Sequence, residues 1–119
     1  MDEFDRFLEL IFTLREKCPW DKIQTIQSLK SDLLSEVYEV VDAIRDKDYD
    51  NLKEEIGDVI WISGLITQVA KEEGFFDMAS VLKDVNEKMV RRHPHVFGTM
   101  RAKSAEDARL IFYQVKDSE

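Results

Sequence analysis

Hydrophobic residues recur every three or four positions along most of this chain, which is the spacing of an amphipathic helix. No stretch alternates apolar and polar residues as a half-buried strand does. The pattern therefore predicts an all-α fold, an antiparallel helical bundle of about five helices. The expected helices cover about 3–16, 25–46, 51–73, 77–92 and 104–115.

Residues with known helix-starting and helix-ending preferences bound these segments. Short polar side chains cap the first turn of a helix, whereas proline and glycine end helices. Ser104 with Asp107 three residues later resembles a capping box. The other expected caps are Thr25, Asp48 or Asp50, and Asp77, and the expected stops are Pro19, Gly74 and Pro94.

The second and third expected helices carry apolar residues over much of their circumference, among them Ile60 and Trp61. The polar stretch 45–51 between them has the length of a connection between antiparallel helices. Two flanking helices leave part of this hairpin uncovered, so we expect it to pack against the hairpin of a second subunit. The core helices would then complete a four-helix bundle in a homodimer or a higher homo-oligomer.

The length of 119 residues predicts a single helical domain over 1–119. Its net charge of −8 argues against binding to a nucleic-acid polymer or an anionic membrane. The single Cys18 excludes an internal disulfide, and the apolar runs are too short to span a membrane. Because the N-terminal residues are acidic and include no basic signal-peptide region, we expect a cytoplasmic protein.

Two pairs of carboxylates, Glu36/Glu39 and Glu55/Asp58, occupy the predicted hairpin, each pair on one helix face because of its i, i+3 spacing. Counting back from the connection brings the two pairs level. Carboxylates beside an apolar stripe need a positive partner. An all-oxygen group without Cys or His favours a hard divalent cation. The alternative is a structural cluster neutralised by Lys or Arg.

With these residues in view, the chain resembles the MazG family of nucleoside triphosphate pyrophosphohydrolases, within the all-α NTP pyrophosphatase superfamily. The matching blocks cover about residues 15 to 100 and follow the family's order. They are Cys18–Asp21 (CPWD), Gln27–Lys30 (QSLK), Leu34–Glu39 (LSEVYE), Glu54–Asp58 (EEIGD) and Asn86–Gly98 (NEKMVRRHPHVFG).

This resemblance implies hydrolysis of a nucleoside triphosphate to the monophosphate and pyrophosphate, with Mg²⁺ or with Mn²⁺ in its place. It also implies that Glu36, Glu39, Glu55 and Asp58 are the metal ligands. Either Glu36 or Glu39 would act as the catalytic group that orients or deprotonates the attacking water.

One position departs from the family pattern, because the motif begins with Glu where this chain has Ser35. Serine cannot act as a base or as a charged partner of the metal ligands. The alternative function is therefore a catalytically weak nucleotide- or metal-binding regulatory module. A third possibility is a helical interaction domain whose acidic cluster is structural.

The basic residues Lys88, Arg91 and Arg92, with two histidines after them, form the one dense cationic cluster of the sequence. Arg91 and Arg92 resemble the family's paired arginines and suit a triphosphate, although cations at a helix C-terminus also complement its dipole. For His93 and His95 a structural turn around Pro94 is as good an explanation.

Three further residues are candidate substrate contacts. Lys22 would bind phosphate and Trp20 would lie near the base; alternatively, Trp20 fills the core. Lys116 lies in a segment that loosely resembles a WExxK motif of the family, so it would reach a phosphate or simply be solvated.

Overall fold

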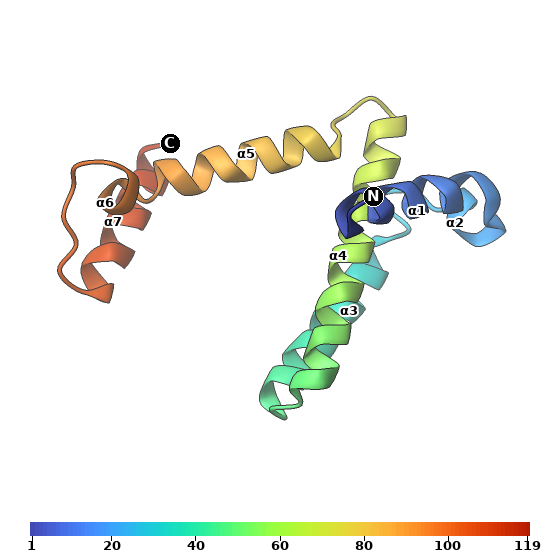
Figure 1. Ribbon diagram of the computed structural model, residues 1–119, viewed down its shortest axis with the longest axis horizontal. Helices are drawn as coiled ribbons and strands as arrows, with labels where there is room; N and C mark the ends of the chain where they lie inside the picture. The colour runs from blue at the N-terminus through green and yellow to red at the C-terminus, as the bar shows by residue number, and fades with distance from the viewer. The chain divides into compact units, whose positions relative to one another are not determined.

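The structure, a computed structural model, describes all residues from 1 to 119 and contains seven helices and no strand (Figure 1). The predicted all-α class is therefore confirmed. The helices are α1 (Glu3–Lys17), α2 (Pro19–Ile23), α3 (Lys30–Arg45), α4 (Tyr49–Glu72), α5 (Met78–Arg91), α6 (Pro94–Phe97) and α7 (Ala105–Ser118). None of them combines the length and the apolarity that crossing a membrane requires.

The two helices beyond the expected five are short ones, α2 and α6, which lie where a break and a loop were predicted. Each begins with its proline, Pro19 or Pro94, in the first turn. Proline ends the preceding helix, but its fixed φ and missing N–H suit the first position of a new one. The same residue is therefore both the stop that was predicted and the start that was not.

The chain divides into two compact units, Met1–Met78 and Ala79–Glu119, which are described here one at a time. A single domain over 1–119 stays a prediction. In the first unit, α3 and α4 pack together along a hairpin whose connection is residues 46–48, as predicted (Figure 1). The side chain of Asp48 accepts a hydrogen bond from the backbone N–H of Asn51 and caps α4, so of the two candidate caps Asp48 is the one used.

Each helix of the hairpin is followed by a residue whose backbone adopts the left-handed conformation, which lets the chain turn. At the end of α4, Gly74 has φ +79°, and the N–H groups of Gly74 and Phe75 donate to the carbonyls of Lys71 and Ala70. This Schellman arrangement satisfies carbonyls that the helix leaves unpaired. At the end of α3 the same position is taken by Lys47, with φ 52°, although its side chain makes this conformation costly.

The start of α3 differs from the prediction, because Thr25 does not cap that helix. The helix begins at Lys30, and its N-cap Leu29 makes no side-chain hydrogen bond. Thr25 and Ser28 instead bond to each other's backbone N–H groups, at 3.0 and 2.8 Å. This local turn gives the backbone N–H groups of Thr25 and Ser28 their partners, and it competes with the helical conformation.

The core of the first unit lies where α1 packs on α4. Ile11, Leu29, Leu65 and Val69 form its buried cluster. The two helices approach so closely that a Cβ added to Gly64 would lie 2.6 Å from the Ile11 side chain. The absence of a side chain at this position therefore sets the distance between α1 and α4.

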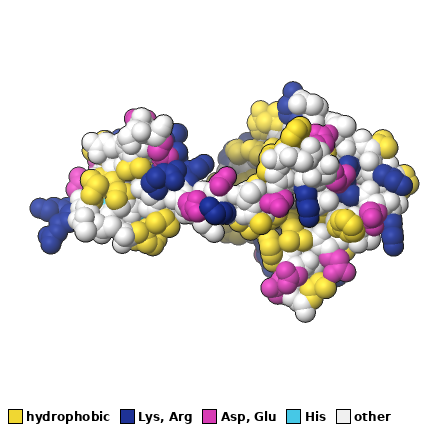
Figure 2. All heavy atoms as spheres, turned by 90° about the horizontal axis from the view of Figure 1, so that it is seen from above, with side chains coloured by type: hydrophobic (Ala, Val, Ile, Leu, Met, Phe, Trp, Pro, Cys, Tyr) yellow, Lys and Arg dark blue, Asp and Glu magenta, His cyan; other side chains and the backbone are white.

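A row of apolar side chains on α3 and α4 stays outside this core, and we call it the hairpin stripe. Its members on α3 follow three- and four-residue spacing along one face, and two more lie four residues apart on α4. The face drawn in Figure 2 likewise presents hydrophobic side chains at the surface among the charged ones. The stripe comprises Leu34, Val37, Val41 and Ile44 of α3 and Ile56 and Ile60 of α4, which are between 39% and 56% exposed.

In the second unit the predicted capping signal of α7 is confirmed. The hydroxyl of Ser104 accepts a hydrogen bond from the N–H of Asp107, while the Asp107 carboxylate accepts one from the N–H of Lys103. In a standard capping box that second bond comes from the cap residue itself. The predicted cap of α5 at Asp77 stays a prediction.

Candidate functional site

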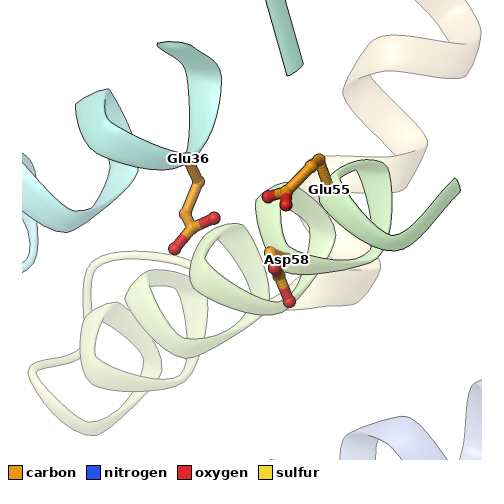
Figure 3. Close-up of side chains that lie close together, drawn as sticks. All are labelled: Glu36, Glu55 and Asp58. Carbon is orange, nitrogen blue, oxygen red and sulfur yellow. The ribbon is translucent and has the colours of Figure 1, made fainter. Parts of the chain in front are cut away.

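Three carboxylates converge where α3 and α4 lie side by side: Glu36 from α3, and Glu55 and Asp58 from successive turns of α4 (Figure 3). One oxygen of each lies within 4.8 Å of the others. We call this group the acidic triad. Its members belong to the two pairs that the sequence predicted to meet across the hairpin.

The register of the hairpin explains why these residues meet. Glu36 stands nine residues before Arg45, the last residue of α3, and Asp58 stands nine residues after Tyr49, the first residue of α4. Since each residue of a helix rises by about 1.5 Å, the two carboxylates lie at the same height above the turn. The i, i+3 spacing then places Glu55 on the same face as Asp58.

No positive side chain offsets the acidic triad. Neither Lys nor Arg forms an ion pair with Glu36, Glu55 or Asp58. Partial burial, followed by the charges of Asp58, Glu39, Glu36 and Glu54, raises the pKa of Glu55. The structure therefore gives no support to the alternative of a cluster neutralised by Lys or Arg. It presents an oxygen-only group whose repulsion a divalent cation would relieve.

Glu39, the fourth predicted ligand, is not part of the triad. It is exposed on α3, one turn closer to the hairpin connection than Glu36. Its charge still contributes to the raised pKa of Glu55, so it lies near enough to act on the triad electrostatically. The structure thus brings together three of the four predicted ligands and leaves the fourth free beside them.

Trp20 and Lys22 lie on the short helix α2 of the same unit. Half of the Trp20 surface is exposed, which contradicts the alternative that Trp20 fills the core. Lys22 is also exposed, and neither side chain forms a hydrogen bond or ion pair with the acidic triad. Both are free to contact a ligand, and that role stays a prediction.

Arg15, which the sequence analysis did not single out, holds this segment in place. Its Nη1 donates to the carbonyl of Asp21 at 2.5 Å and to that of Gln24 at 3.0 Å. The rest of its guanidinium pairs with Glu72 of α4, and these bonds raise the pKa of Arg15 and lower that of Glu72. An arginine gives no sequence signal for such a role, because its partners are backbone carbonyls.

In the second unit, Arg91 and Arg92 share one carboxylate, that of Glu119. Arg91 Nη2 lies 2.9 Å from Glu119 Oε2, and Arg92 Nε lies 2.9 Å from Glu119 Oε1. Hydrogen bonds from Arg92 and then Arg91 lower the pKa of Glu119 to about 2. The two predicted phosphate-binding arginines therefore hold an anion, although it is one of the chain's own residues. Lys88, on α5, is only partly exposed and joins none of these contacts.

Three further residues of this unit, His93, His95 and Lys116, lie near aromatic rings. The rings of His93 and His95 are 5.4 Å apart between centroids, and the Phe112 ring lies 5.5 Å from His93. Lys116 is exposed and its Nζ lies 5.6 Å from the centre of the Tyr113 ring, so its role as a phosphate contact stays a prediction. The structural alternative for the two histidines stays a prediction, since the Nδ1 atom of His95 is buried without a hydrogen-bond partner.

Comparison with known proteins connects these observations to a family. Residues 24–97 match the model of the MazG nucleotide pyrophosphohydrolase domain, and this range contains the whole acidic triad and both arginines. In a structural comparison, the chain superimposes on the crystal structure of a mazG-related protein from Thermotoga maritima with a TM-score of 0.80. That match has 37% sequence identity and covers 95% of this chain and 98% of the other.

Two relatives extend the comparison to nearly the whole chain. The nucleoside triphosphate pyrophosphohydrolase of Escherichia coli K12 is 38% identical over 122 aligned positions, covering 100% of this chain and 46% of that protein. The uncharacterized protein YabN of Bacillus subtilis is 42% identical, covering 98% of this chain and 24% of that protein. The chain thus spans about a quarter to a half of the length of these relatives. By its sequence and by its fold, it belongs to the MazG nucleotide pyrophosphohydrolase family.

Proposed function

We propose that this chain hydrolyses nucleoside triphosphates to nucleoside monophosphates and pyrophosphate, with a divalent metal ion as cofactor. The observation that carries the proposal is the acidic triad: three carboxylates within 4.8 Å and no cationic side chain to offset them. Membership of the MazG family supports the reaction, since relatives such as the Escherichia coli protein are named for it.

The donor set fits Mg²⁺, with Mn²⁺ as a substitute. Glu36, Glu55 and Asp58 would hold the ion. Glu39 could become a fourth ligand if its exposed side chain adopted another rotamer. Hard divalent cations prefer carboxylate oxygens. The pKa of Glu55, raised first by partial burial and then by the neighbouring carboxylates, supports a group that lacks a positive partner. When bound, such an ion neutralises phosphate charge and makes a coordinated water more acidic.

Glu39 is then the better candidate for the group that handles the attacking water. Glu36 belongs to the triad, whereas Glu39 stands beside it with a free, exposed carboxylate. A carboxylate in that position can orient a water molecule and accept its proton as the α–β phosphoanhydride bond is cleaved. We assign Arg91, Arg92 and Lys88 to the phosphates, with Lys22, Trp20 and Lys116 as further substrate contacts.

The hairpin stripe supports the predicted homodimer. Six aliphatic side chains, each between 39% and 56% exposed, follow one face of α3 and continue on α4. A second copy of the hairpin offers the same stripe and would bury both, completing the four-helix bundle. A cytoplasmic location remains part of the proposal.

The second candidate function is a nucleotide- or metal-binding module with little catalysis. Ser35 is the observation that favours it, because this residue directly precedes Glu36 of the triad where the family motif has another carboxylate. With one acid fewer, the site could bind a cation and still activate water poorly.

The deciding experiment measures pyrophosphate release from a panel of ribo- and deoxyribonucleoside triphosphates with Mg²⁺ or Mn²⁺. The wild type is compared with Glu55→Gln and Asp58→Asn, and with Glu54→Gln as the control from the same helix. Release that only the two triad variants abolish supports the proposed reaction.

A thermal melt of each protein with and without the cation completes the design. Binding to the folded state raises stability by about 1.4 kcal/mol at a cation concentration of ten times Kd. Stabilisation without pyrophosphate release would favour the binding module. If neither is seen, the third possibility remains, a helical domain with a structural acidic cluster.

A further inference from the structure

The carboxylate of Glu119 occupies the position between Arg91 and Arg92 with the geometry of a bound anion. Both of its oxygens are used: Oε2 accepts from Arg91 Nη2 at 2.9 Å, and Oε1 accepts from Arg92 Nε at 2.9 Å. Arg92 Nη2 adds a longer contact to Oε2 at 3.4 Å. Two guanidinium groups converge on one carboxylate, which is the arrangement that also recognises a phosphoryl group.

We infer that Glu119 is an intramolecular competitor at this site, which a phosphoryl group of the ligand must displace before Arg91 and Arg92 can bind it. The inference rests on the proposed function, because it takes the two arginines as phosphate-binding residues. The ligand class is a polyphosphate: inorganic pyrophosphate or the phosphate chain of a nucleotide.

The site keeps its shape when Glu119 leaves, because Arg92 has a second support. The Arg92 side chain is only 15% exposed, and its guanidinium carbon lies 5.4 Å from the centre of the Phe112 ring. The Phe112 ring also packs against His93, with 5.5 Å between the ring centroids and an angle of 62° between the planes. A guanidinium held against an aromatic ring keeps its donors in one plane, so an incoming phosphoryl group meets donors already in position.

The Glu119 carboxylate occupies the site between the two arginines, but its contacts are weak enough for a phosphoryl group to displace it. The pair with Arg91 is half exposed on the arginine side, and exposed ion pairs contribute little net stability. A phosphoryl group carries more charge and more acceptor oxygens than a carboxylate. The apparent affinity of a site decreases when fewer molecules have that site open. Removing Glu119 leaves the site open in more molecules, so it must tighten binding.

The test measures the affinity for inorganic pyrophosphate by isothermal titration calorimetry, with a chelator present so that the acidic triad binds no metal. In Glu119→Gln we expect the dissociation constant to fall about fivefold relative to the wild type. The matched control is Glu106→Gln, since Glu106 pairs with Arg109 through the same two kinds of contact, at 2.9 and 3.1 Å. The control should have the same affinity for pyrophosphate as the wild type. Adding Arg92→Gln to Glu119→Gln should abolish the gain in affinity that Glu119→Gln produces.

Glu119→Asp is the second variant, because it keeps the charge but is too short to serve both arginines as well. It should tighten binding in the same direction even if Glu119→Gln fails to fold. Equal affinity of the wild type and both Glu119 variants would overturn the inference and leave the proposed reaction intact. Tighter binding by those variants in a protein that releases no pyrophosphate from nucleotides would support the inference and contradict the proposed catalysis.

Discussion

Arg15 and Glu72, 57 positions apart in the sequence, form two parallel hydrogen bonds: Arg15 Nε donates to Glu72 Oε2 at 3.0 Å and Nη2 donates to Oε1 at 2.8 Å. The third nitrogen of the same guanidinium donates to the backbone carbonyls of Asp21, in α2, and of Gln24, just after it. One side chain therefore ties α1, α4 and the segment carrying Trp20 and Lys22 to one another.

We expect Arg15→Lys to lower the free energy of unfolding by about 2 kcal/mol, because an ammonium group cannot make the paired bonds and reach the carbonyls as well. Urea denaturation followed by circular dichroism measures the change. Arg45→Lys is the control, since Arg45 makes only exposed local pairs with Asp42 and Asp46. Equal losses in both variants would show that Arg15 does not have the role described.

Lys47 pays a conformational cost that glycine would not. Its φ of 52° lies in the left-handed region, which disfavours a residue with a Cβ. Lys47→Gly should therefore raise the free energy of unfolding by about 0.5 kcal/mol, the relief of strain being partly offset by the greater freedom of glycine in the unfolded chain. Lys53→Gly, within α4, should instead lower it by about 1 kcal/mol. Urea denaturation followed by circular dichroism measures both changes. A lower free energy of unfolding in Lys47→Gly as well as in Lys53→Gly would contradict the prediction.

The pH dependence of stability should reveal the cost of the charged Glu55 carboxylate, which comes first from its partial burial and then from its acidic neighbours. The folded-state pKa of Glu55 lies above its ordinary value of about 4.5, so between these two values the folded chain binds more protons than the unfolded one. The free energy of unfolding contributed by this group must fall as the pH rises through that window. Above the folded-state pKa the destabilisation is fully present.

The measurement compares the wild type with Glu55→Gln by urea denaturation from about pH 4.5 to neutrality. As the pH rises, the free energy of unfolding of the variant should increase relative to that of the wild type. Saturating Mg²⁺ should remove this difference by stabilising only the wild type. Glu54→Gln serves as the control, because Glu54 is exposed and contributes least to the shift. A difference between wild type and Glu55→Gln that does not vary with pH would contradict the prediction.

A charge in the hairpin stripe should prevent dimer formation. Val41 is 52% exposed and lies in the middle of the stripe, so Val41→Glu would place a desolvated carboxylate in the contact between two copies. Size-exclusion chromatography with light scattering should find a dimer for the wild type and a monomer for Val41→Glu. Ser31→Glu adds the same charge to an exposed position of α3 and should stay dimeric. A monomeric wild type would refute the proposed assembly.

The sequence predicted those parts of the fold that depend on local chemistry. The pattern predicts caps at Ser104 and at either Asp48 or Asp50, because each precedes an amphipathic segment, and Ser104 and Asp48 accept the expected backbone hydrogen bonds. Thr25 carried the same signal and failed, because Ser28 gave it an alternative partner within a turn. Propensity indicates that a residue can cap a helix, but neighbouring side chains decide whether a helix begins there.

The candidate site was predictable for a similar reason and to a similar extent. Periodicity and one short connection were enough to place Glu36 opposite Asp58. The contacts of Arg15 and of Glu119 could not be found in this way, because they join residues 57 and 27 or 28 positions apart whose register no local pattern specifies. Glu39 illustrates the intermediate case, since its height along α3 was predicted but its carboxylate does not enter the triad.

Both tryptophans, Trp20 and Trp61, lie in the unit Met1–Met78. Trp61 packs edge-on against Phe7 beside the core, whereas Trp20 is half exposed on α2. Intrinsic fluorescence thus carries two signals from the same unit, a blue-shifted one sensitive to the α1–α4 contact and a red-shifted one sensitive to the surroundings of α2. The unit Ala79–Glu119 contains no tryptophan, so with excitation selective for tryptophan it contributes to circular dichroism but not to fluorescence. Superimposable unfolding curves from the two spectroscopies would mean that the whole chain melts as one cooperative body, and separate midpoints would report the two units independently.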